Sequence, residues 1–248
     1  MKRVNLYPDN IIYLYQENQG QGSARNLGLQ YANGKYINFL DSDDKFSGNT
    51  FYNVYEFFEK HYEEIDFVST RMFFFDKYEG QHPLNYKFEE ERIIDLTESW
   101  DYPQLSASSA FFKRELFDDY RFPESLVNSE DTLMLNKMLL ENPKYGVVTE
   151  AIYWYRRRSD ESSTIDSSST KKEFYTNRLD NYFKALINAS IEKYGEVVKF
   201  IQYLIVYDIQ WMFSVKNISE ILTNDENKEI YTSIQEVLSQ LDDNIILT

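Results

Sequence analysis

Residues 18–44 constrain the fold most, because they join a helix and a short apolar strand to an acidic turn. Ser23 precedes a predicted helix over 24–31, which ends at Asn33 and Gly34. The apolar run 36–40 predicts a strand that stops at Asp41-Ser42-Asp43-Asp44, called here the acidic turn. A helix followed by such a strand indicates an α/β sheet, in which ligands bind beyond the carboxyl ends of the strands.

The same alternation continues along the first 160 residues or so. It predicts a mainly parallel mixed α/β sheet flanked by helices. Residues 81–103 are charged and irregular in pattern, which favours an excursion over the surface. The other predicted strands are 11–15, 66–75, 106–112, 145–148 and 151–156, and the other predicted helices are 49–62, 113–120 and 130–140.

The character of the chain changes after a loop at 159–170 that is rich in Ser, Thr and Asp. Residues 171–241 have helical spacing almost throughout, with breaks near Gly195 and over 217–227. We therefore predict two regions, a sheet-containing domain at 1–166 and a helical region at 167–248, with a boundary near Ser167.

Charge and composition exclude several classes of function. The formal net charge of -15 makes nucleic acid an unfavourable partner, so a phosphorylated substrate needs a local basic patch or a metal ion. The chain has no cysteine, which excludes disulfides and thiolate zinc sites. We expect neither a signal peptide nor a membrane-spanning helix, because no run of about 18 apolar residues occurs. A cytoplasmic location fits these features.

The acidic turn is the first candidate site. Carboxylates at the end of a strand suit Mg²⁺ or Mn²⁺, and such an ion can also bridge a diphosphate. The alternative is a solvated turn in which Asp44 or Ser47 caps the next helix. A dinucleotide site at Gly20-x-Gly22 is rejected, because the third glycine of that motif would fall on Arg25.

A longer pattern surrounds this turn. The run Asn18-Gln19-Gly20, the run Ala24-Arg25-Asn26-Leu27-Gly28 and the strand leading into the acidic turn together resemble the signature of family 2 glycosyltransferases. The resemblance implies a GT-A fold of the bacterial capsule and cell-wall type and a nucleotide-sugar donor. It assigns donor binding to Asn18, Gly20, Arg25, Asn26, Asp41 and Asp43, and binding of Mg²⁺ or Mn²⁺ to Asp41 and Asp43.

Glu130 and Asp131 are the second candidate pair. Acidic residues at the start of a helix are favoured by the helix dipole, which is a purely structural explanation. The segment around them nonetheless looks like the Glu-Asp motif of family 2. The resemblance implies that Asp131 is the general base for the acceptor hydroxyl and that Glu130 supports it.

Three arginines at 156–158 form the third candidate. An arginine run is usually a solvated face, but in so acidic a chain it is also a local anion site. The segment is similar to a loop that closes on the donor diphosphate in many family 2 enzymes, and Arg156 and Arg158 are the residues we favour. The two histidines, His61 and His82, lie outside this region, so a metal would depend on the aspartates and the donor phosphates.

Full-length family members open with a strand, a helix and a second strand that carries an Asp-rich loop around the nucleotide base. Ten residues precede the first predicted strand here, so we expect an N-terminally incomplete GT-A domain. The first strand would then pair directly with the second, receive its neighbours from another polypeptide or pack loosely. The C-terminal helices resemble the tails of bacterial cell-wall and capsule enzymes, and we expect them to cap the catalytic domain.

The resemblance implies an inverting, metal-dependent transfer of a sugar from a nucleotide-sugar to a hydroxyl of a glycan or lipid-linked acceptor. The setting would be surface polysaccharide synthesis. The alternative is a truncated, catalytically inactive remnant that serves as a partner-binding module. Three kinds of association stay open. The chain could associate peripherally with the inner face of the membrane, bind a polypeptide that supplies the missing N-terminal half, or form a homo-oligomer.

Overall fold

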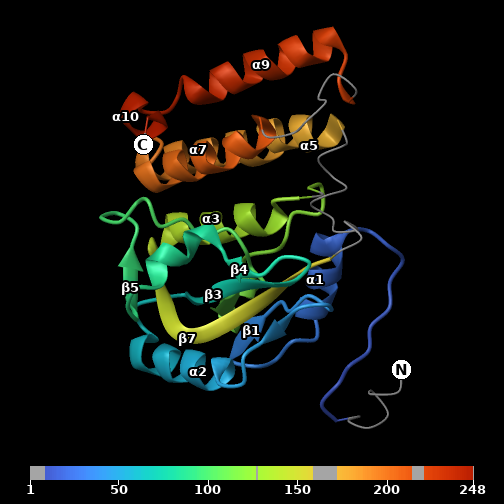
Figure 1. The fold of residues 1–248 in the computed structure, drawn as a ribbon, viewed down its shortest axis with the longest axis vertical. Helices are drawn as coiled ribbons and strands as arrows, with labels where there is room; N and C mark the ends of the chain where they lie inside the picture. Colours follow the sequence, from blue (N-terminus) through green and yellow to red (C-terminus); the bar gives the residue numbers. More distant parts are fainter. Residues whose placement is uncertain (1–8, 127, 159–171, 214–220, 248) are drawn as a thin grey trace.

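The computed structural model describes residues 9–126, 128–158, 172–213 and 221–247 (Figure 1). The strands are β1 (Tyr36–Asn38), β2 (Lys45–Phe46), β3 (Phe67–Asp76), β4 (Gly80–Gln81), β5 (Arg92–Asp95), β6 (Ala110–Lys113) and β7 (Lys144–Arg157). The α-helices are α1 (Gln21–Leu29), α2 (Thr50–His61), α3 (Glu130–Glu141), α5 (Lys172–Asn177), α6 (Lys184–Tyr194), α7 (Lys199–Phe213), α9 (Asn224–Leu238) and α10 (Asp243–Ile246). Shorter turns are η2 (Pro83–Phe88), η3 (Arg114–Asp118) and the π-helical η4 (Arg178–Phe183).

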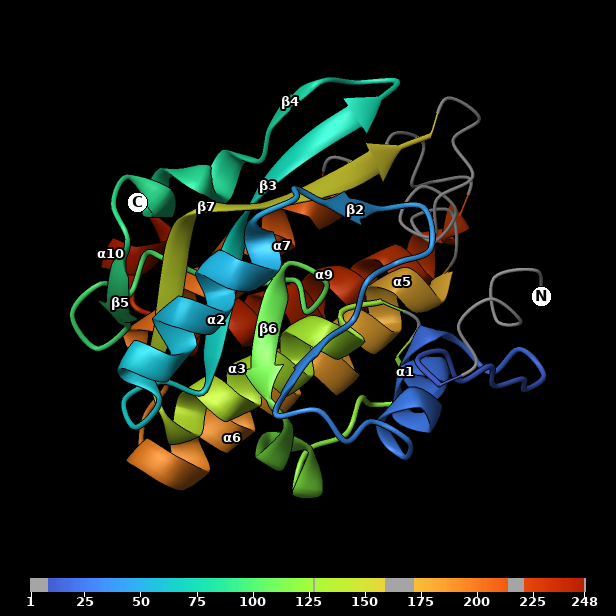
Figure 2. The same ribbon diagram turned by 90° about the horizontal axis from the view of Figure 1, so that it is seen from below.

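All the described strands join one sheet in the order β1-β6-β3-β7-β2, with β4 beside β3 and β5 beside β7. Figure 2 shows β4, β3, β7 and β2 side by side. Strand β6 is antiparallel to both β1 and β3, whereas β3 and β7 are parallel. Strands β1, β3 and β7 therefore run in the same direction, and their carboxyl ends reach the same edge of the sheet.

The predicted α/β class, with helices flanking a mixed sheet, is confirmed. The parallel content is lower than expected, because β3 and β7 are the only parallel pair among the described strands. The reason is the position of β6, which enters between β1 and β3 in the opposite direction. Alternation of strands and helices predicts the direction of successive strands, but it does not tell which later strand inserts between them.

Strand β7 replaces the two short strands predicted at 145–148 and 151–156. It pairs with β3 through Val148, and the pairing resumes at Ile152 after a register shift between Thr70 and Arg71. The extra residues on β7 make a bulge, which bends the strand without ending it. Figure 1 shows the resulting curve of β7 around the sheet.

The strand predicted at 11–15 does not form, and that prediction is wrong. These residues are extended without strand pairing, and the side chains of Ile12, Tyr13 and Tyr15 are exposed. A β-strand is stabilised by hydrogen bonds to a neighbour, and no described strand lies next to this segment. Direct pairing with β1, one of the three arrangements considered, is therefore wrong as well.

Residues 81–103 are part of the fold and do not form the expected irregular excursion. They contain η2 and β5, and β5 pairs with the start of β7. Leu84, Phe88 and Ile94 are buried in this segment, although charged residues surround them in the sequence. The apolar positions are too widely spaced for the periodicity of a helix or strand to reveal them.

Two apolar layers cover the sheet (Figure 1). Helix α2 packs on one face, where Val54, Phe57 and Phe58 meet Val68 and Val148. Helix α3 covers the other face, and its buried side chains form one continuous core with the C-terminal helices. Within the described residues, α3 contacts α6, and α9 forms the outermost layer.

The C-terminal region is helical, as predicted, and α6 ends at Gly195 in the left-handed conformation. The predicted boundary near Ser167 lies outside the described residues, and so does part of the second predicted break. None of the helices in the described part of the chain combines the length and apolar character needed to cross a bilayer.

Candidate active site

Arg25 on α1 lies at the centre of the candidate site. Its Nη1 donates to Glu130 Oε1 at 2.7 Å, and its Nη2 lies 3.6 Å from Asp41 Oδ1. Its side chain is only 11% exposed, and the guanidinium lies over the ring of Phe122. The nearby carboxylates keep the pKa of Arg25 above its ordinary value despite the opposing effect of burial. One cation thus joins the acidic turn to the start of α3.

A close approach of backbones makes this arrangement possible. A Cβ at Gly22 would lie 3.0 Å from the carbonyl oxygen of Pro123, so α1 packs where no larger residue fits without a shift. Asn26 stabilises the same contact. Its Oδ1 accepts from the Phe122 N–H, and its Nδ2 donates to the Phe122 carbonyl and to Glu124. Asn26 therefore holds the loop before α3 against α1.

Glu130 is buried and Asp131 is half-buried at the start of α3. Burial raises the pKa of each carboxyl, and the charge of Arg25 opposes that rise in both. Asp131 Oδ2 accepts from the Ala107 N–H at 3.1 Å, and its Oδ1 accepts from the Thr132 N–H at 2.9 Å. A half-buried carboxylate fixed by two amides and a nearby cation suits a positioned base.

The acidic turn is separated from the end of β1 by two residues and lies at the edge where β3 and β7 also end. Asp41 Oδ2 accepts from the Ser108 hydroxyl at 3.1 Å. Asp44 accepts from the Tyr153 hydroxyl and from the Arg156 N–H, and burial raises its pKa to about 6. Asp44 thus holds the turn against β7, while Asp41 and Asp43 face other partners.

The arginines at the end of β7 divide between two carboxylates. Arg158 Nε donates to Asp43 Oδ2 at 2.8 Å, which brings the arginine to the acidic turn. Arg156 Nε donates to Asp76 Oδ2 at 2.8 Å, at the end of β3. Asp76 and Ser129 are the non-glycine residues of the described chain with positive φ; Asp76 ends β3 and Ser129 immediately precedes α3. Such conformations are costly and collect at functional sites.

A divalent cation fits the donor set of the acidic turn only in part. No group of three or more His, Asp or Glu side chains is arranged to hold a metal in the described ranges. Asp41 and Asp43 offer two carboxylates on one turn, and hard cations such as Mg²⁺ prefer oxygen ligands of this kind. The remaining ligands would have to come from the donor phosphates or water.

The structure brings most of the predicted site residues together. Arg25, Asp41 and Glu130 are in direct contact, Asp131 is fixed beside them, and Asp43 meets Arg158. Asn18 has a local role, since its side chain accepts from the Gly20 N–H, and Gly20 takes a positive φ just before α1. Arg156 directs its guanidinium to Asp76, away from the turn.

Sequence reasoning missed the loop at 104–109, called here the base loop, which supplies the Ala107 N–H and the Ser108 hydroxyl. We expected a strand to begin at 106, but β6 begins at Ala110. The signal was present, since Ser106-Ala107-Ser108-Ser109 has no β-branched or aromatic side chain.

The chain resembles bacterial proteins of teichoic acid synthesis. The sequence profile of Glycosyl transferase family 2 matches residues 2–121. The chain is 39% identical over 242 residues to the minor teichoic acid biosynthesis protein GgaB of Bacillus subtilis, covering 97% of this chain and 27% of GgaB. It is 36% identical over 210 residues to GgaA of the same organism, covering 83% of this chain and 47% of GgaA. The chain thus spans less than half the length of either relative.

The fold also resembles a solved structure. A crystal structure of residues 1–349 of Staphylococcus aureus TarS with UDP-GlcNAc superimposes with a TM-score of 0.69 at 18% identity. The match covers 98% of this chain and 69% of that one. This likeness confirms the predicted GT-A fold, and the profile match and the two relatives confirm the predicted family. We conclude that the chain carries a domain of glycosyltransferase family 2.

Proposed function

We propose that this domain transfers a sugar from a nucleotide-sugar donor to a hydroxyl group of a cell-wall polymer or of its lipid-linked precursor. The observation that carries the proposal is the contact of Arg25 with both Asp41 and Glu130. This contact places a carboxylate turn suited to a metal and diphosphate beside a half-buried, amide-bound carboxylate suited to a base. Glycosyl transfer to a hydroxyl needs both.

The donor would bind at the acidic turn. Asp41 and Asp43 would hold Mg²⁺ or Mn²⁺, which neutralises charge on the leaving diphosphate. Arg158, which pairs with Asp43, would exchange that carboxylate for a donor phosphate, because arginine binds both with the same geometry. Gly20 and Asn18 would shape the approach to α1, and Arg156 would stabilise the end of β7 through Asp76.

The chemical step would be one displacement with inversion. The acceptor oxygen bonds to the anomeric carbon as the bond from that carbon to the diphosphate oxygen breaks. Asp131 takes the proton of the acceptor hydroxyl, and the nucleoside diphosphate leaves with the bonding electron pair. Arg25 would keep Asp131 ionised despite its burial, and Glu130 would hold Arg25 in place.

The substrate class follows from the relatives. GgaA and GgaB are named for minor teichoic acid biosynthesis, and TarS is named as a poly(ribitol-phosphate) beta-N-acetylglucosaminyltransferase. We propose a teichoic-acid-like polymer as acceptor and a UDP-sugar as the first donor to test, because TarS was solved with UDP-GlcNAc. In this proposal the polymer grows at the inner face of the membrane, and the domain associates peripherally with that face.

Calorimetry with UDP-, GDP- and CDP-sugars tests the donor site. We expect binding of one nucleotide class in the presence of Mn²⁺ or Mg²⁺ and its loss with a chelator. Failure of all of them to bind, with metal present, would contradict the proposal and favour a partner-binding module.

Asp131→Asn tests the base. Transfer should fall by roughly 1,000-fold or more while donor affinity stays within about two-fold, because a base acts in the transition state more than in the ground state. Asp95→Asn, on β5, is the control and should transfer normally. Equal losses of donor affinity and turnover in Asp131→Asn would refute the role of base.

A further inference from the structure

Lys87 carries a buried amine that the proposed chemistry does not use. It lies on η2 and is only 3% exposed. Its Nζ donates to the Pro103 carbonyl at 2.8 Å and to Gln104 Oε1 at 2.6 Å. Within the part of the chain that the structure describes, no carboxylate lies within ion-pair distance of it. Burial lowers its pKa to about 7. Burying an amine that contacts only neutral oxygens costs free energy, and that cost must be offset by what the amine contributes to the fold or the site.

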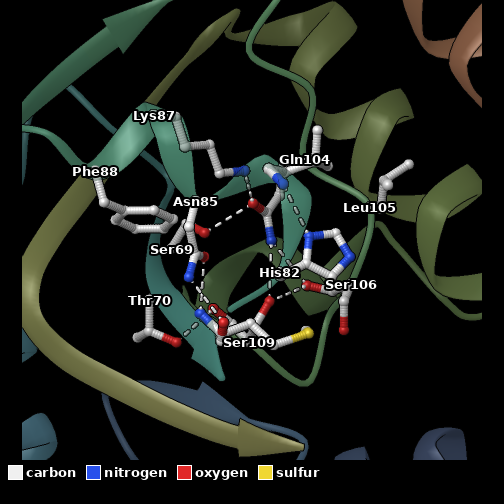
Figure 3. Close-up of a pocket in the computed structure, with 12 residues that line it drawn as sticks. Ser69, Thr70, His82, Asn85, Lys87, Phe88, Gln104, Leu105, Ser106 and Ser109 are labelled. Atoms are coloured by element: carbon white, nitrogen blue, oxygen red, sulfur yellow. Dashed lines mark hydrogen bonds between the residues drawn. The ribbon is translucent and has the colours of Figure 1, made fainter. Parts of the chain in front are cut away.

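Gln104, the first residue of the base loop, connects Lys87 to the rest of that loop. Its Oε1 also accepts from Ser69 Oγ at 2.7 Å, and its Nε2 donates to the Ser106 carbonyl at 3.0 Å. Its own carbonyl accepts from the Asn136 amide on α3 at 3.0 Å. Figure 3 shows Lys87 and Ser69 converging on the Gln104 side chain. Both polar ends of this glutamine are thus occupied, and they connect η2 and β3 to the base loop.

The far side of the base loop contacts both halves of the proposed site. The Ala107 N–H donates to Asp131 Oδ2 at 3.1 Å, and the Ser108 hydroxyl donates to Asp41 Oδ2 at 3.1 Å. The loop also accepts from Thr132 Oγ1 through the Leu105 carbonyl. A displacement of the loop would therefore move the base and the acidic turn together.

We propose that Lys87 is a positioning residue that, through Gln104, fixes the base loop so that Ala107 and Ser108 orient Asp131 and Asp41. Lys87 Nζ donates to both Gln104 Oε1 and the Pro103 carbonyl, so it holds these two oxygens at one point. Charge-assisted hydrogen bonds are shorter and stronger than neutral ones, which suits a fixed support behind a catalytic group. The inference rests on the proposed role of the Asp131 site.

The test compares two variants with a control in the same pocket. Lys87→Met keeps the volume of the side chain and removes the amine, and Ser69→Ala removes the milder contact to Gln104 if the first variant folds poorly. Asn85→Ala is the control, because Asn85 also lines this pocket but its side chain hydrogen-bonds to the Met72 backbone and not to Gln104 in the described structure. Each protein is followed by hydrogen exchange at the base loop and by transfer kinetics, well below its Tm.

In Lys87→Met we expect amide exchange at Ala107 to become at least about ten-fold faster. We expect kcat to fall between about 10- and 100-fold, because small displacements of reacting groups have effects of this size. Ser69→Ala should show a smaller change of the same kind. Asn85→Ala should lower Tm and leave both the Ala107 exchange and kcat near wild type.

Unchanged exchange at Ala107 in Lys87→Met would overturn the inference, and so would equal losses of kcat in Lys87→Met and Asn85→Ala. Wild-type protein that binds no donor and transfers no sugar would instead overturn the proposed function. The exchange measurement would still decide whether Lys87 holds the loop.

Discussion

Arg25→Met removes the cation that joins the acidic turn to the start of α3. The side chains of Arg25 and Glu130 are only 11% and 4% exposed, so their ion pair is screened little by water. Methionine keeps the apolar part of the side chain over Phe122 and leaves the buried Glu130 and the half-buried Asp131 as neighbouring carboxyls without a cation. Removing one partner of a buried pair typically costs about 3–5 kcal/mol. For a chain of this length, that corresponds to a fall in Tm of roughly 6–20 °C.

The loss of folding stability in Arg25→Met should depend on pH. Burial and the charge of Asp131 raise the pKa of Glu130 above its ordinary 4.5, while Arg25 lowers it. A carboxyl with a raised pKa in the folded state binds its proton more tightly there, so stability is greatest at low pH and falls as pH rises through the folded pKa. Without Arg25 that pKa rises further. The free energy of unfolding of Arg25→Met should therefore be only slightly below that of wild type at pH 5, and the full difference should be reached near pH 8.

Urea unfolding of both proteins at pH 5 and at pH 8 measures the difference. Glu130→Gln in the Arg25→Met background should recover part of the stability at pH 8, because it removes one of the two neighbouring charges. Lys35→Met is the control, since Lys35 and Glu59 form an exposed pair, and it should change stability far less. A loss below about 1 kcal/mol at pH 8, or one that is equal at both pH values, would refute the reasoning.

Three glycine substitutions test how helices α1 and α2 pack. Gly22→Ala should lower Tm and donor affinity, because its Cβ would lie 3.0 Å from the Pro123 carbonyl oxygen; unchanged values would show that α1 can shift freely. Gly28→Ala, on the same helix, should instead raise stability by about 0.5–1 kcal/mol, since a Cβ there meets nothing within 4 Å; a loss would contradict this. Gly146→Ala should cost about 1–3 kcal/mol in urea unfolding, because its Cβ would lie 2.3 Å from the Phe57 ring; a neutral result would mean that α2 yields easily.

Local pattern was sufficient for helices α2 and α3 and for the acidic turn. Helices α2 and α3 form within a residue or two of their predicted bounds, because their apolar residues repeat with helical spacing. The turn at 41–44 follows a strand as expected, since the apolar run stops where the aspartates begin. The residues that we selected for donor and base also fall near one another, because Arg25 on α1 contacts both the acidic turn and the start of α3.

Pattern was insufficient wherever a neighbour distant in the sequence decides the outcome. Residues 11–15 have the composition of a strand, but a strand also needs a paired backbone, and the described chain offers none. In contrast, the bulged pairing with β3 keeps β7 continuous through a point where its apolar pattern breaks.

The sequence by itself determined the family, the acidic turn and the two acidic residues at the start of α3, because each is a short run of residues with a local signature. The tertiary structure decided how they work together. It placed Arg25 between Asp41 and Glu130, although 105 residues separate Arg25 from Glu130. It also placed the base loop against Asp131, with Lys87 behind it. Contacts of this kind depend on the burial of charge between elements, and burial is a property of the packed molecule that no local pattern contains.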